Sequence, residues 1–165
     1  MLDRMHRSRE LPQNNSLVHV HLGYAPPYRW NAMLDFLGPR AFPGIEHVSD
    51  RAYRRAPTID AHHATVMVEA NPAANALAVA LRVEDLRHLP NVIERTRRYF
   101  DLAADPLPIA AHLSRDPVLR RQLRRVPGIR IPGAWSMFEL AVRAILGQQV
   151  SVKAATTFAA RLVTA

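Results

Sequence analysis

The sequence predicts an α+β fold, in which a small antiparallel sheet carries helices on one face and a helical segment follows. Residues 17–23 alternate between apolar and polar side chains, as a strand with one buried face does. Two more strand-like runs, 64–70 and 76–83, flank the turn-forming sequence Asn-Pro-Ala-Ala-Asn at 71–75, which predicts an antiparallel hairpin. Beyond Asp105 no run is typical of a strand, and the spacing of apolar residues becomes helical.

Two helices are expected within the sheet region. Residues 30–37 place apolar side chains at helical spacing, and Gly38 with the proline after it ends this helix. The second helix begins at Pro90, a favourable first helical residue, and its apolar stripe extends to Phe100. Between the two helices, residues 45–56 resemble an irregular strand. The order strand, helix, three strands, helix predicts a layer of sheet covered by a layer of helix.

The remainder of the chain is predicted to be helical, over residues 107–113, 116–125, 136–146 and from Ser151 onward. Gly147 is suited to the position just past a helix end, and Ser151 is a favourable N-cap. The last two helices therefore form a tight helix-turn-helix unit with two long amides, Gln148 and Gln149, at its tip. We expect three segments: a tail or linker at 1–16, an α+β domain at 17–105, and the beginning of a helical domain at 106–165.

Composition limits the classes of function. The net charge of +8 and the pI of about 11.1 favour an anionic partner, most simply nucleic acid. A basic surface without a specific partner is the alternative. Lys153 is the only lysine, and a GC-rich genome enriches arginine without any functional cause. The absence of cysteine excludes disulfides and thiolate metal sites. No apolar run approaches the ~20 residues of a membrane span, and no signal peptide is evident, so a cytoplasmic protein is expected.

The histidines do not predict a metal site. His62 and His63 are adjacent, and His19 and His21 share one face of a strand. Neither pair has a carboxylate or cysteine partner at ligand spacing in the sequence. No glycine-rich phosphate loop is present either. We therefore expect no metal and no cofactor.

Three runs of sequence resemble one family. Pro132-Gly133-Ala134-Trp135, followed by the run Phe138–Val152, is similar to the hallmark of the 3-methyladenine DNA glycosylase II family, bacterial alkylation-repair enzymes of the helix-hairpin-helix superfamily. The run Pro26–Leu37 resembles the start of that family's N-terminal domain. Tyr99–Leu102 with Asp105-Pro106 resembles its domain junction. The resemblance covers about residues 17–164, with the motifs in the expected order.

The resemblance implies a fold and a function. The sheet would be half of a TATA-binding-protein-like layer, followed by the first helices of an incomplete all-α glycosylase domain. The function would be base-excision repair, in which alkylated bases of the 3-methyladenine type are flipped out of duplex DNA and released by hydrolysis of the N-glycosidic bond. The implied partner is double-stranded DNA containing alkylated bases, and a monomer without cofactor is expected.

The family's site residues match four positions around the turn and one aromatic. Gln149 matches the wedge that fills the gap left by the flipped base; a polar exposed turn is the alternative. Gln148 would contact sugar or base edges, and Ser151 opens a helix whose free N–H groups suit a phosphate or simply caps it. Lys153 would touch phosphate or lie on a solvated face. Phe36 matches an aromatic of the base pocket; a core phenylalanine is the alternative.

The chain departs from the family in its catalytic part. The family's catalytic aspartate and helix-hairpin-helix motif are expected beyond Ala165, and none of the carboxylates present matches that position. The chain therefore resembles a truncated enzyme that is inactive by itself. A non-catalytic fragment or weak DNA-binding module is the alternative. A helix-turn-helix regulator is disfavoured, because the last helix offers Ala, Thr and Phe rather than base-reading side chains.

Overall fold

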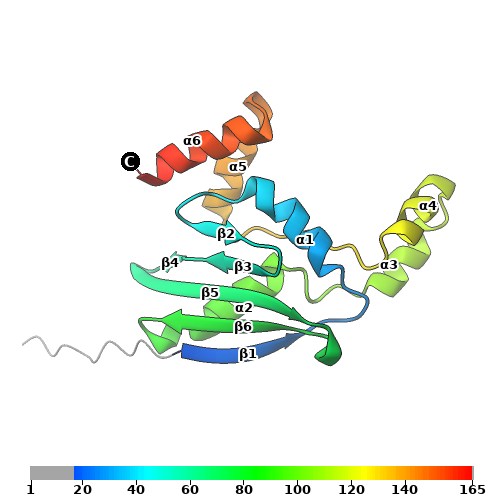
Figure 1. Ribbon diagram of the computed structural model, residues 1–165, viewed down its shortest axis with the longest axis horizontal. Coiled ribbons are helices and arrows are strands. Elements are labelled where there is room, and N and C mark those ends of the chain that lie inside the picture. The colour runs from blue at the N-terminus through cyan, green and yellow to red at the C-terminus, as the bar shows by residue number, and fades with distance from the viewer. Residues whose placement is uncertain (1–16, 165) are drawn as a thin grey trace, which may run out of the picture.

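The computed structural model describes residues 17–164 and combines one antiparallel sheet with helices (Figure 1). The predicted tail at 1–16 lies outside the described residues. The strands are β1 (Leu17–Gly23), β2 (Glu46–Val48), β3 (Ala52–Arg55), β4 (Thr58–Ile59), β5 (His62–Asn71) and β6 (Ala76–Val83). The α-helices are α1 (Trp30–Leu37), α2 (Leu89–Tyr99), α3 (Pro106–Leu113), α4 (Pro117–Arg125), α5 (Met137–Gln149) and α6 (Val152–Thr164). Three short 3-10 turns are η1 (Gly38–Arg40), η2 (Pro72–Ala74) and η3 (Leu86–His88).

The sheet has the order β1-β6-β5-β3-β2, with β4 paired to β5 off this path. Every pairing is antiparallel. The predicted hairpin is present: β5 and β6 pair from Ala64 with Val83 to Asn71 with Ala76, and Asn75 in the turn adopts a left-handed conformation. No strand occurs between residues 106 and 164. The predicted α+β class is therefore confirmed.

Helices α1 and α2 pack on the sheet and enclose the core with it. Alternate residues of β5 and β6, such as Val66, Val68 and Val79, are buried, as the period-2 pattern predicts. The helices contribute the residues at the predicted spacing: Trp30, Met33, Leu34 and Leu37 from α1, and Val92, Thr96 and Tyr99 from α2. The residues between the buried ones, including Thr65 and Arg82, lie on the opposite, uncovered face of the sheet.

Two local predictions are wrong. Residues 45–56 form not one irregular strand but the hairpin β2–β3, because the Ser49 hydroxyl accepts a hydrogen bond from the Ala52 N–H, 3.1 Å away, and closes a turn. Gly147 does not lie past the end of its helix. Helix α5 continues to Gln149, and the Val150 N–H donates to the Leu146 carbonyl at 3.3 Å. The helical period persists through Gly147, so the turn is shorter than predicted.

The C-terminal helices attach to the sheet through polar side chains as well as through apolar ones. On α5, apolar side chains at helical spacing point outward: Phe138 is 77% exposed, and Ile145 is exposed as well. Helix α5 also carries Glu139 and Arg143, which contact residues of the sheet. Exposed apolar stripes of this kind mark surfaces that other protein segments cover.

Within residues 17–164, no helix combines the length and the apolar character that a membrane span requires.

Candidate nucleic-acid interface

The α5–α6 unit is built by two serine caps. The Ser136 hydroxyl accepts a hydrogen bond from the Glu139 N–H at 3.1 Å and begins α5. The Ser151 hydroxyl accepts from the Ala154 N–H at 3.3 Å and begins α6, as predicted. Between the helices, Val150 adopts an extended conformation that turns the chain. Because a side-chain cap satisfies only one N–H, the first turn of α6 keeps other free donors.

The polar residues predicted for the interface gather at this turn. Gln148 lies in the last turn of α5, and Ser151 and Lys153 lie at the start of α6; all three are exposed. Gln149 is the last residue of α5, and its side chain lies outside the described part of the structure. The free N–H groups of α6, an exposed lysine and an exposed amide together form a surface that can accept a phosphate.

A buried ionic network fixes α5 to the sheet. Its centre is Glu46 of β2, whose side chain is only 1% exposed. Arg143 of α5 forms ion pairs with Glu46 and, at 2.6 Å, with Glu139. Arg55 of β3 forms ion pairs with the same two carboxylates, at 3.0 Å for Glu46. Two strands and one helix are thus joined by alternating charges, and Arg143 is a structural residue of this junction.

Two tyrosines add hydrogen bonds to the Glu46 carboxylate of this network. The hydroxyl groups of Tyr53 and Tyr99 donate to Glu46 Oε1 at 2.6 and 2.9 Å. Burial raises the pKa of Glu46, but the charges of Arg143 and Arg55, together with hydrogen bonds from Tyr53 and the Phe42 N–H, hold that pKa below its ordinary value. Burial raises the pKa of both tyrosines. Glu46 is therefore ionised and its hydroxyl partners are neutral, which makes the junction between the sheet and α5 rigid.

Phe36 lies on the outer side of α1 rather than in the core. Its side chain is 44% exposed, which excludes the alternative of a core phenylalanine. The Arg40 guanidinium carbon lies 4.0 Å from the centre of the Phe36 ring, in a cation–π contact. The ring face is therefore accessible to a flat cationic group, and Arg40 occupies such a position here.

The turn η1 connects this aromatic to the α5–α6 unit. The Arg143 guanidinium donates to the Arg40 carbonyl at 2.7 Å, and the Thr156 hydroxyl of α6 donates to the Pro39 carbonyl at 3.2 Å. A depression of about 210 Å³ lies between η1 and the two helices, lined by Arg40, Arg143 and Gly147 among others. The exposed aromatic and the polar turn thus belong to one connected region.

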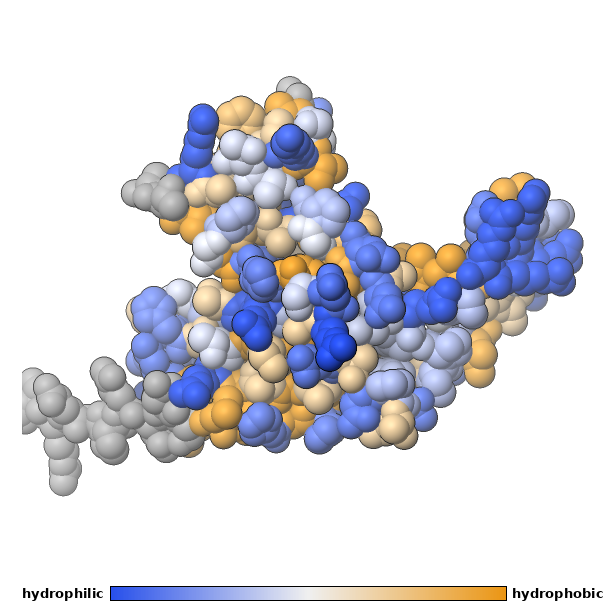
Figure 2. Space-filling view, viewed as in Figure 1, coloured by the Kyte–Doolittle hydropathy of each residue, from blue (hydrophilic) through white to orange (hydrophobic). Residues whose placement is uncertain are grey.

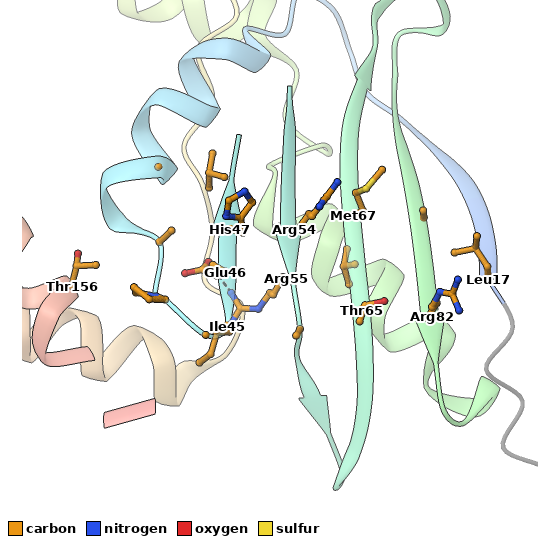
Figure 3. A pocket seen from close by; sticks show the side chains of 18 of the residues that line it. Leu17, Ile45, Glu46, His47, Arg54, Arg55, Thr65, Met67, Arg82 and Thr156 are labelled. Carbon is orange, nitrogen blue, oxygen red and sulfur yellow. Dashed lines mark hydrogen bonds and ion pairs between the residues drawn. The ribbon is translucent and has the colours of Figure 1, made fainter. Parts of the chain in front are cut away.

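A second depression lies on the uncovered face of the sheet (Figure 3). Its volume is about 1000 Å³, and His47, Arg54 and Met67 lie side by side across its floor. Thr156 contributes one wall, but none of Phe36, Gln148, Ser151 and Lys153 lines it. Figure 2 shows a separate hydrophilic surface over α4, at the opposite side of the molecule from α6. The predicted site residues therefore belong to neither feature.

Sequence reasoning missed the residues that hold the site in place. Glu46 and Arg55 are paired across the β2–β3 hairpin, whereas Glu139 comes from the distant helix α5, and none stands in a motif of its own chemistry. A weak signal is available at Arg55, an arginine at the end of a strand that is otherwise largely buried. Trp30 and Tyr28 are structural residues: the Trp30 ring N–H donates to the Arg51 carbonyl, and the Tyr28 hydroxyl donates to the Phe100 carbonyl.

Comparisons with known proteins agree with the fold. A family model described as the AlkA N-terminal domain matches residues 19–136. The chain is 40% identical over 148 residues to a protein of Mycobacterium tuberculosis named "Probable bifunctional transcriptional activator/DNA repair enzyme AlkA", covering 90% of this chain and 29% of that protein. It is 34% identical over 141 residues to the "DNA-3-methyladenine glycosylase 2" of Escherichia coli, covering 86% of this chain and 48% of that protein.

A solved structure has the same arrangement of elements. The structure entitled "3-methyladenine dna-glycosylase from Archaeoglobus fulgidus" superimposes with a TM-score of 0.71 at 24% identity, and the match covers 87% of this chain and 48% of that one. At this level of identity the match shows the fold alone. The chain spans between 29% and 48% of the length of these relatives.

Proposed function

The chain belongs to the AlkA N-terminal domain family, and we propose that it serves the excision of alkylated bases, of the 3-methyladenine type, from double-stranded DNA. In this proposal the base is flipped out of the helix and its N-glycosidic bond is hydrolysed. The names of the Mycobacterium tuberculosis and Escherichia coli relatives, a DNA repair enzyme and a DNA-3-methyladenine glycosylase, support this reaction class. We further propose action as a monomer in the cytoplasm and a domain boundary near residue 105.

One observation carries the proposal. The α5–α6 unit exposes Gln148, Ser151 and Lys153 at its turn, while Glu46 and Arg143 fix α5 to the sheet through buried contacts. A rigid helix pair with an exposed polar end can push a side chain into DNA without itself being displaced. Gln149, at the end of α5, is the proposed wedge, and the free N–H groups after Ser151 take the neighbouring phosphate.

Phe36 is the proposed stacking surface for the flipped base. An alkylated purine is electron-poor, and a cationic ring is attracted to an aromatic face. Arg40 already makes this kind of contact with Phe36, at 4.0 Å. In this proposal the base displaces Arg40 from the ring or stacks on the other face of it.

Binding to a duplex that contains an abasic analogue tests the proposal, because such a duplex imitates the flipped state. Fluorescence anisotropy is expected to show tighter binding than to the intact duplex of the same sequence. Gln149→Ala is expected to weaken the abasic complex about tenfold or more, since a filled stack is worth a few kcal/mol. Gln149→Leu is expected to keep much of the affinity, because leucine also fills the gap. Equal affinity of wild type and Gln149→Ala for the abasic duplex would support the alternative, an exposed polar turn without a role in DNA binding.

The alternative is a non-catalytic fragment or a weak DNA-binding module. It shares the basic surface but requires no preference for the abasic duplex. The preference for the abasic duplex in the anisotropy measurement therefore distinguishes the two. Release of 3-methyladenine from alkylated DNA by the purified chain, if the activity persists after further purification, would contradict the expectation that the chain is inactive by itself.

A further inference from the structure

Two histidines and an aspartate meet at the end of the sheet where β5 begins and β6 ends. His62 is the first residue of β5, Asp85 caps the turn η3, and His88 is the last residue of η3. The antiparallel register that pairs Ala64 with Val83 brings these segments together. Each of the three side chains offers one ligand atom, and these atoms lie within 4.8 Å of one another. The sequence alone does not reveal the cluster, because His62 is far along the chain from the other two residues.

Each imidazole has a carboxylate beside one of its nitrogens. His62 Nδ1 lies 3.8 Å from Glu84 Oε2, and His88 Nδ1 lies 3.7 Å from Asp60 Oδ2. The ring centres of the two histidines are 5.1 Å apart. Metal-binding histidines commonly have one ring nitrogen on the metal and the other on a carboxylate, which orients the ring. Glu84 and Asp60 are placed for this orienting role.

Asp85 is a carboxylate that hydrogen bonds hold in one position. Its Oδ1 accepts the Arg87 N–H at 2.9 Å, which holds it at the start of η3. The Arg87 side chain also donates to Asp85 Oδ2, from Nε at 2.8 Å. The Arg87 side chain that balances its charge is 83% exposed, whereas the Asp85 side chain is 18% exposed. The carboxylate therefore stays in place if Arg87 swings into solvent and another cation takes its position.

We propose that His62, Asp85 and His88 form a binding site for a divalent transition-metal ion, with Zn²⁺ as the probe. Two imidazole nitrogens and one carboxylate oxygen are ligands that Zn²⁺ accepts. Bonds of about 2.0–2.2 Å require the three groups to close in on the ion, which the half-exposed His62 ring and the departure of Arg87 make possible. The ion links the start of β5 to the turn that leads into α2, and it takes no part in the proposed DNA contact.

Competition with a chromophoric chelator measures the affinity of the chain for Zn²⁺. Replacing either histidine, in His62→Ala or His88→Ala, is expected to weaken binding at least tenfold. Arg87→Gln is expected to tighten it, because the substitution removes a competing cation and leaves all three ligands. The matched control is His63→Ala, because the His63 side chain lies on the exposed, uncovered side of β5. The affinity of this variant for Zn²⁺ should equal that of wild type.

Thermal unfolding gives a second readout, since an ion that binds only the folded chain raises its melting temperature. Zn²⁺ is expected to raise the Tm of wild type and Arg87→Gln but not of His62→Ala. The pair His19 and His21 on β1 offers the competing explanation of Zn²⁺ binding by a strand. Unchanged affinity in both His62→Ala and His88→Ala, or a loss produced instead by His19→Ala, would overturn the proposal.

Discussion

Replacing Glu46 by glutamine perturbs the junction between the sheet and α5 at its centre. The Glu46 carboxylate accepts hydrogen bonds from Arg55, Tyr53 and Tyr99 and forms an ion pair with Arg143. Glutamine keeps the shape of the side chain but removes its charge. It also turns an amide NH₂ toward groups that are themselves donors, so at least one buried donor loses its partner.

The expected loss follows from the burial of the group. Breaking a buried ion pair by removing one partner costs about 3–5 kcal/mol, since the other charge stays buried without compensation. Glutamine retains one acceptor oxygen, so we expect a loss of about 3 kcal/mol, at the lower end of that range. In a protein of this size 1 kcal/mol corresponds to roughly 2–4 °C. Glu46→Gln should therefore lower the Tm by about 6–12 °C.

The stability difference between wild type and Glu46→Gln is also expected to depend on pH, in a direction that the pKa of Glu46 determines. Burial alone raises the pKa of Glu46, but Arg143 and Arg55, together with the hydrogen bonds from Tyr53 and the Phe42 N–H, lower it, and the folded pKa is below the unfolded one. Such a carboxylate contributes stability that is fully present above its unfolded pKa of about 4.3 and is lost as the pH falls through the folded pKa. The stability difference between wild type and Glu46→Gln should therefore be constant at neutral pH and narrow below about pH 4.

Urea unfolding followed by circular dichroism measures this difference at each pH. Glu69→Gln, on the exposed side of β5, is the control and should change stability by less than about 0.5 kcal/mol. A loss below about 1 kcal/mol for Glu46→Gln, or a difference that does not depend on pH, would refute the role assigned to the network.

Two glycines provide further predictions, and both are measured by the same urea unfolding. Gly147→Ala should stabilise the chain by about 0.5 kcal/mol, because Gly147 lies within α5 and nothing lies within 4 Å of an added Cβ; destabilisation would instead favour the helix end that the sequence suggested. Gly128→Ala should destabilise it by more than about 1 kcal/mol, because φ is +76° and the added Cβ would meet the Pro27 carbonyl oxygen at 2.5 Å. Equal stability of Gly128→Ala and wild type would contradict this close approach.

The parts of the fold that local patterns encode could be predicted from the sequence. The predicted bounds of β1 and α1 coincide with those observed, because strict alternation and helical spacing are both followed by a breaking residue. The hairpin of β5 and β6 is recognisable from the turn-forming residues between them. The unpredicted strand β4 has two residues, which is too short to carry a period.

The candidate site also has parts that local sequence predicts and parts that it does not. The Ser151 cap and the exposure of Gln148 follow from local sequence. The ion pair of Arg143 with Glu46 does not, because these two residues meet only after α5 has packed against the sheet. The local sequence around Arg143 contains no sign of Glu46, its partner from another segment.

Disulfide cross-linking at residue 149 tests the central claim, insertion of the α5–α6 turn into DNA, most directly. The chain has no cysteine, so Gln149→Cys introduces a unique thiol. The partner is a duplex that carries a thiol tether at an abasic site, and His112→Cys on the exposed surface of α3 is the matched control. The account predicts rapid cross-linking of Gln149→Cys to the tethered site and slow cross-linking of His112→Cys. Equal rates for the two variants, or preferential reaction of His112→Cys, would contradict it.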